Sequence, residues 1–95
     1  MTLTIEGHKY RTSGSGEPFD AFALRYEDVA ALLGQEVALP LPETRFKVCE
    51  LLDCGAQIAL CIGNGQEKIF DLKTEETVRL ERGILGVEIR FRLAE

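Results

Sequence analysis

Residues 77–93 read TVRLERGILGVEIRFRL and contain the clearest period-two pattern in the chain. From residue 85 onward apolar and polar side chains alternate, which is typical of a β-strand with one face against a core. The apolar face consists of Leu85, Val87, Ile89, Phe91 and Leu93, and the opposite face of Gly86, Glu88, Arg90 and Arg92. The pattern predicts a long strand at the end of the chain, with one buried face.

The same stretch predicts an antiparallel hairpin. A two-residue turn at residues 82–83 places Leu80 opposite Leu85, so the apolar faces of the two strands match. The same register places Glu75 opposite Arg90, where opposite charges attract across the strands. Both features favour the hairpin.

Before this hairpin the period of two continues back to residue 45. It predicts three further strands, RFKVCELLDC (45–54), AQIALCI (56–62) and EKIFDL (67–72). Turn-forming residues separate them, at Gly55 and at residues 63–65 and 73–76. Residues 63–65 read GNG, which favours a tight hairpin turn over a phosphate loop, because no Lys-Ser/Thr ending and no helix follow.

The amino-terminal half is less regular. Residues 2–6 alternate as a strand, and Glu6 with Gly7 predicts a turn back into residues 8–12. SGSGEP at residues 13–18 is typical of a flexible loop. Residues 19–24 are compatible with either helix or strand.

YEDVAALLG at residues 26–34 predicts the one helix, with acids at its start, an i, i+3, i+4 apolar stripe and Gly34 at its end. The VALPLPE segment that follows is extended, because Pro40 and Pro42 exclude helix. Two prolines also argue against a central strand and place this segment at a sheet edge or in a crossing loop.

Together these elements predict a single α+β domain over residues 1–95, mainly antiparallel β. We expect a small sandwich or partly open barrel of about five to seven strands with one short helix at about 26–34. A chain of 95 residues is too short for two cores.

The amino-acid composition limits the kinds of partner that this chain is expected to bind. The net charge is −5 and both halves are acidic, so electrostatic binding to nucleic acid or anionic lipid is disfavoured. No apolar run is long enough for a signal peptide or a membrane span. Three cysteines, an odd number, without an export signal predict a cytoplasmic protein with reduced thiols.

Those cysteines, Cys49, Cys54 and Cys61, have the spacing C-x4-C-x6-C, which differs from the paired knuckles of structural zinc sites. Strand parity separates Cys54 from the other two, so three ligands do not converge. We therefore expect no metal site and interpret the cysteines as small apolar core residues.

The chain shows no convergent catalytic set. His8 is the only side chain that titrates near neutrality, and no nucleophile motif accompanies it. The acidic pairs fit a helix start and a hydrophilic turn better than a catalytic cleft. We expect no catalytic residues and no cofactor, and the chain is not expected to be an enzyme.

The leading hypothesis is a non-catalytic interaction or regulatory domain that binds another protein or a second copy of itself. Candidate contact points are the apolar and proline residues of the extended segment, together with the helix face and the 13–18 loop. The segment's residues are Val37, Leu39, Pro40, Leu41 and Pro42. Charged residues in place of Leu39 and Leu41 are expected to abolish binding and leave the fold intact.

Two alternatives come from other classes. The excess of acid is compatible with an inhibitor that occupies a basic nucleic-acid-binding surface of a larger machine. The carboxy-terminal hairpin carries Arg79, Arg82, Arg90 and Arg92, which is compatible with an RNA- or DNA-binding regulator. Interspersed glutamates favour a salt-bridged surface instead, so nucleic acid remains the weaker alternative.

Overall fold

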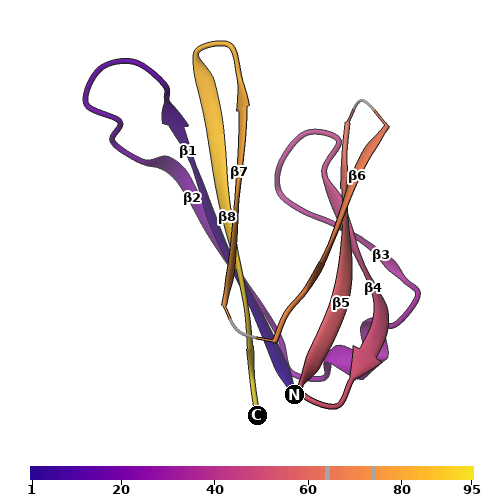
Figure 1. Ribbon diagram of the computed structural model, residues 1–95. Coiled ribbons are helices and arrows are strands. Elements are labelled where there is room, and N and C mark those ends of the chain that lie inside the picture. The colour runs from indigo at the N-terminus through magenta and orange to yellow at the C-terminus, as the bar shows by residue number, and fades with distance from the viewer. Residues whose placement is uncertain (64, 74) are drawn as a thin grey trace.

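The computed structural model describes residues 1–63, 65–73 and 75–95, and these form eight β-strands and one 3-10 helix (Figure 1). The elements are β1 Thr2–Arg11, β2 Phe19–Tyr26, η1 Val29–Leu32, β3 Glu36–Ala38, β4 Arg45–Leu52, β5 Gly55–Ile62, β6 Gln66–Asp71, β7 Glu76–Arg82 and β8 Leu85–Ala94. The predicted turns at residues 63–65 and 73–76 include Asn64 and Thr74, which lie outside the described residues. The mainly antiparallel β class is confirmed, with more strands than expected.

The strands form two antiparallel sheets of four. Their orders are β2-β1-β8-β7 and β3-β4-β5-β6. The first sheet joins the two ends of the chain, because β1 pairs with β8 from Thr2 opposite Ala94 to Arg11 opposite Leu85. Figure 1 shows both termini at the same end of the molecule, with the two sheets closest there and diverging toward the hairpin tips.

The core lies between the inward faces of the two sheets. Phe46 of β4 meets Phe91 of β8 edge-on, with ring centroids 6.2 Å apart, and Phe70 of β6 lies 5.4 Å from the same ring. These contacts join the sheets, and burial of such apolar surface is the main favourable term in folding. The largest fully buried side chains are Phe46, Phe91, Leu3, Ile5, Ile58, Leu60, Leu72, Ile89, Val29, Val48 and Val78.

The predicted helix at 26–34 is much shorter in the structure. Only Val29–Leu32 is helical, as one turn of 3-10 geometry, and Asp28 caps it by accepting a hydrogen bond from the Ala30 amide. Tyr26 belongs to β2 instead, because strand pairing with β1 continues up to that residue. Tertiary pairing therefore outweighs the local helical pattern.

Residues 19–24, left open by the sequence, are strand. β2 pairs with β1 from Tyr26 opposite Leu3 to Phe19 opposite Lys9, with one bulge. The predicted turn at residues 6–7 is wrong, since β1 runs through it without interruption. Gly7 serves packing there: a Cβ at this position would collide with the ring of Phe22.

The β7–β8 hairpin exists, but its register differs from the predicted one by two residues. The turn comprises Gly83, with φ of +64°, and Ile84, so Leu80 lies opposite Val87 and not opposite Leu85. A shift of two keeps every side chain on the face that the sequence predicts, because the side-chain period of a strand is two.

Candidate functional site

The outward face of the first sheet carries most of its polar side chains. Alternation along the strands places the core residues on one face and the polar residues on the other. On the outward face of β1, β8 and β7 lie Glu6, His8, Tyr10, Glu88, Arg90 and Arg79. Side chains from three strands, distant in sequence, thus share one surface.

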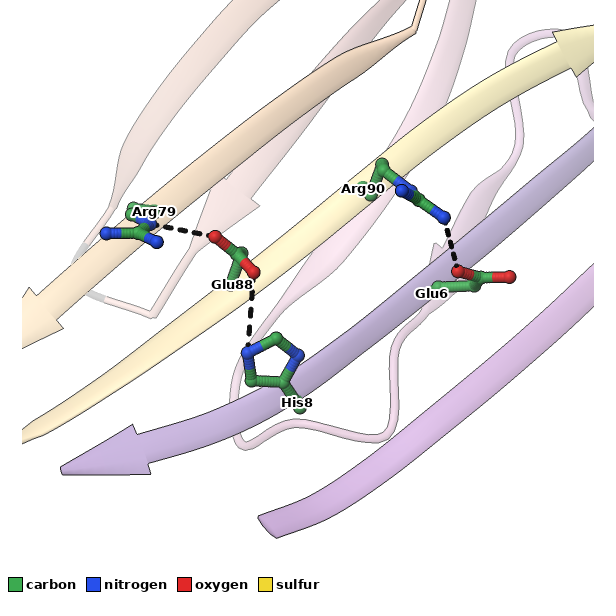
Figure 2. Close-up of polar contacts among 5 residues, drawn as sticks. All are labelled: Glu6, His8, Arg79, Glu88 and Arg90. Carbon is green, nitrogen blue, oxygen red and sulfur yellow. Dashed lines mark hydrogen bonds and ion pairs between the residues drawn. The ribbon is translucent and has the colours of Figure 1, made fainter. Parts of the chain in front are cut away.

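Glu88 is the centre of the first charge network on this face. The Arg79 Nε donates to Glu88 Oε1 at 2.8 Å, and His8 Nε2 lies 3.4 Å from Glu88 Oε2 (Figure 2). Both partners lie directly opposite Glu88 on the neighbouring strands. The hydrogen bond to Glu88 is the largest cause of a raised Arg79 pKa.

Arg90 is the centre of the second network. It donates from Nη2 to Glu6 Oε2 at 2.8 Å, and its Nη1 lies 3.2 Å from Glu75 Oε1 (Figure 2 shows the first contact). The predicted Glu75–Arg90 pair is therefore confirmed, although the two residues meet diagonally and not in direct register. The second oxygen of Glu6, Oε1, forms no ion pair or hydrogen bond with the described residues.

Tyr10 extends the polar row at the far end of β1. Its ring covers Gly86, where a Cβ would collide with it, and the Arg79 guanidinium lies 5.7 Å from the ring centroid. Burial raises the pKa of Tyr10, and the charge of Glu81 raises it further. The hydroxyl is buried, and Glu81 raises the pKa of Tyr10 as a hydrogen-bond partner as well as through its charge. Tyr10 thus packs as part of the sheet surface.

An open groove of about 620 Å³ crosses this face from β2 toward β7. Ala21 and Ala23 line it at the edge of the sheet, and Glu6, His8 and Glu88 line it further in. Because alanine side chains are short, nothing on β2 closes the groove at the sheet edge. A long side chain on an added strand would therefore have access to the carboxylates.

β2 is also the least protected sheet edge. Its residues 21–24 read AFAL, four uncharged positions, and its charges lie only at Asp20 and Arg25. The other three edge strands have features that disfavour pairing with an added strand. Four of the seven residues of β7 and three of the six residues of β6 are charged. β3 has only three residues and leads into Pro40. The backbone of β2 is therefore the best place for an added strand.

The predicted contact segment is placed differently from the expectation. Leu39 and Leu41 are only 5% and 8% exposed and belong to the core, while Val37 is half-buried. Pro40 and Pro42 alone have exposed side chains. The chain turns back here, with the Leu39 amide donating to the Thr44 carbonyl, and this turn directs both leucines inward. Neither leucine is available to a partner in this structure.

The arginines of the candidate nucleic-acid surface divide into two kinds. Arg79 and Arg90 are engaged by carboxylates in the networks above. Arg82 and Arg92 are exposed and form no ion pair with the described residues. Half of the predicted cationic surface is thus neutralised within the sheet.

The interpretation of the cysteines as core residues is wrong. Cys49 and Cys54 are exposed and Cys61 is half-buried, and all three are free thiols. Cys49 falls in the β4 bulge between Val48 and Glu50, which interrupts the strand parity assumed from the sequence. Within the described ranges, no group of three His, Cys, Asp or Glu residues has the arrangement to hold a metal.

Cys61 has its own polar contact. Its Sγ donates to Glu67 Oε2 across the β5–β6 pair, at 3.6 Å. Burial raises the pKa of the Cys61 thiol, and the hydrogen bond and charge of Glu67 raise it further. At neutral pH this thiol is protonated and a poor nucleophile.

No family model matches the chain, and neither a curated protein nor a solved structure matches it. In the described part of the chain, no helix has the length and apolarity needed to cross a membrane. Any statement about function therefore rests on the surface itself.

Neither the β2 edge nor Glu6 was predicted from the sequence as part of a binding site. The feature of the sequence that indicates this edge is the uncharged run AFAL at residues 21–24.

Proposed function

We propose that this chain is a non-catalytic protein-interaction domain that accepts an extended segment of a partner protein as an added strand on β2. The observation that carries the proposal is the uncharged edge at residues 21–24, which contrasts with the charged or shortened edges elsewhere. Backbone hydrogen bonds would supply affinity, and side-chain contacts at alternate positions would supply selectivity.

The groove supports the same proposal. Ala23 lies opposite Glu6 in the β1–β2 register, so a residue added opposite Ala23 lies on the same row as Glu6. The unpaired oxygen of Glu6 favours a basic side chain at that position. On the inner side, the half-buried Phe22 and Leu24 favour apolar side chains at the alternate positions. The expected partner segment is thus extended, with basic and apolar residues in alternation.

The two other functions have weaker support. Nucleic-acid binding through the hairpin is disfavoured because Arg79 and Arg90 are paired with carboxylates. The hypothesis of an acidic inhibitor is supported by the net charge of −5 alone. Two exposed cysteines favour a reducing compartment, and we therefore propose a cytoplasmic location.

Affinity capture from the source lysate, with and without nuclease, tests the proposal. The bait is the wild type, the edge variant Ala23→Lys, or the control variant Ile69→Lys, at an exposed position of β6, an edge strand of the other sheet. A protein that binds the wild type and Ile69→Lys but not Ala23→Lys, and that survives nuclease, is the expected result. Equal capture by all three baits would exclude the β2 edge, and loss on nuclease treatment would favour nucleic acid. Steep loss of captured protein with rising salt would favour the acidic inhibitor.

A further inference from the structure

We propose that the core face of the first sheet, at the end distant from the chain termini, binds an acidic and apolar segment of a partner protein between Arg11 and Arg82. This surface differs from the β2 edge and selects the opposite charge, so the inference goes beyond the proposed function. Two neighbouring rows of side chains form the surface, which we call the distal patch. Its residues are Phe19, Lys9, Val87 and Leu80 in one row and Arg11, Leu85 and Arg82 in the next.

The strand register brings the two arginines of the distal patch together from opposite ends of the chain. Arg11 and Arg82 both lie directly opposite Leu85, one on each neighbouring strand. Leu85 lies four positions before the fully buried Ile89 on β8, and alternation places both on the core face. The distal patch is therefore the continuation of the core face beyond the core.

The distal patch is accessible in the described structure. Leu85 is 47% exposed and Phe19 36%, and Ile84 in the adjoining turn is 69% exposed. The sheets diverge toward the hairpin tips, which leaves this end of the face open (Figure 1). Val87 and Leu80 are half-buried and pack against the core cluster. Apolar surface thus runs from the core to the tip, and exposed apolar surface of this kind is typical of a binding site.

The charges of the distal patch are basic, in a chain whose net charge is −5. The charged residues of the patch are Lys9, Arg11 and Arg82. Asp20, beside the patch, pairs with Lys9 at 3.5 Å. Arg11 and Arg82 are exposed, and neither forms an ion pair with the described residues. Uncompensated cations beside exposed apolar side chains favour an occupant that is acidic and apolar.

Hydrogen bonds fix the positions of the two arginines relative to each other. The Thr12 amide donates to the Ile84 carbonyl at 2.9 Å, and Thr12 Oγ1 donates to the Gly83 carbonyl at 3.1 Å. These bonds join the end of β1 to the β7–β8 turn. The arginines lie on β1 and β7, two strand spacings or roughly 10 Å apart. Guanidinium groups on both sides can therefore contact carboxylates of one bound segment.

The orientation of the distal patch favours a protein segment over a lipid bilayer. The patch lies on the side of the first sheet that faces the second sheet, so a flat membrane would touch only the hairpin tips (Figure 1). A single polypeptide segment, in contrast, can lie along the exposed side chains.

Selection of peptides from a phage-displayed random library on the purified chain tests the inference. Peptides that bind the wild type but not the double variant Arg11→Glu/Arg82→Glu are expected to be acidic and apolar. One such peptide, synthesised and labelled for fluorescence anisotropy, is expected to lose at least about tenfold in affinity in the double variant. Its affinity for the wild type is expected to fall as salt is added.

Lys73→Glu/Arg92→Glu is the matched control, because it changes the net charge equally at exposed positions outside the distal patch. This control and Ala23→Lys are both expected to bind the peptide as the wild type does, and circular dichroism verifies that each variant is folded. Failure to enrich peptides, enrichment of basic peptides, or an equal loss in the control would overturn the inference.

Vesicles that contain an anionic phospholipid distinguish a membrane from a protein partner. The wild type is expected not to sediment with them, and sedimentation that is lost in Arg11→Glu/Arg82→Glu would overturn the assignment to a protein segment. Loss of peptide binding in Ala23→Lys but not in the arginine double variant would overturn this inference and leave the proposed function standing.

Discussion

Glu6 and Arg90 lie 84 positions apart in the sequence and form an ion pair of 2.8 Å on the outward face of the first sheet. They meet because β1 and β8 pair along their whole length, which places the two residues directly opposite each other. Arg90 also reaches Glu75, so one guanidinium compensates two carboxylates. The ion pair therefore connects the first and last strands of the chain, on the same surface that we propose for binding.

Removal of Arg90 is expected to destabilise the fold slightly. Its side chain and that of Glu6 are 43% and 50% exposed, so solvent weakens the attraction. Arg90→Ala should therefore lower the free energy of unfolding by about 0.5–1 kcal/mol. Urea denaturation measures this, with Arg92→Ala as control, since Arg92 is exposed on the same strand and forms no ion pair with the described residues. Equal effects from both substitutions would contradict a role for the network.

Charged residues at positions 39 and 41 are expected to unfold the domain, in contrast to the expectation from the sequence. Leu39 and Leu41 are 5% and 8% exposed and belong to the core cluster. Truncation of a buried leucine costs about 2–5 kcal/mol, and burial of a charge costs more. Leu39→Asp should thus give a chain without a cooperative urea transition. Pro40→Ala, at an exposed neighbour, is the control, and a folded Leu39→Asp would show that the loop is not part of the core.

Two glycines are expected to tolerate alanine differently. A Cβ on Gly55 would lie 2.6 Å from the backbone carbonyl oxygen of Leu72, which cannot move without disturbing β5 and β6. A Cβ on Gly86 would meet the ring of Tyr10, and a side chain can rotate away. Gly55→Ala should therefore destabilise by about 1–3 kcal/mol and by more than Gly86→Ala. Thermal unfolding of both variants measures the order, and the reverse order would contradict the assigned contacts.

Alkylation of Cys61 is expected to depend strongly on pH. Burial and the adjacent Glu67 raise the pKa of this thiol, so little thiolate exists at neutral pH and the rate should increase in alkaline buffer. Glu67→Gln removes the charge and should lower the pKa and speed labelling at a given pH. Peptide mapping after iodoacetamide treatment measures both, with Asp71→Asn on the same strand as control. An unchanged rate in Glu67→Gln would exclude this contact as a cause.

Much of the strand content could be predicted because alternation is a local property. The apolar residues of β8 lie on the core face as expected, and the β7–β8 register error of two residues did not change any face. Where alternation was interrupted, prediction failed. The bulge at Cys49 reversed the assumed parity of the strand residues that follow it, Glu50 to Leu52. The acids before residues 29–32 indicated a longer helix than the single turn that forms.

The candidate site depended far more on the tertiary structure. Ala21 and Ala23 have no functional group that would mark them as site residues in the sequence. They belong to the candidate site because β2 is an edge strand and because charged side chains of the neighbouring strands lie on the same face of the sheet. The pairing of Glu6 with Arg90 requires the first and last strands to be neighbours. No short-range pattern encodes that adjacency.

The sequence by itself determined the class of the domain, the approximate position of most strands and the face that each apolar side chain of β8 occupies. The reason is that strand alternation and turn chemistry act over a few residues. Only the tertiary structure decided which strands are neighbours, which edges stay open and that Leu39 and Leu41 are core residues. Those outcomes depend on how two sheets bury their apolar faces against each other, which is a property of the whole chain.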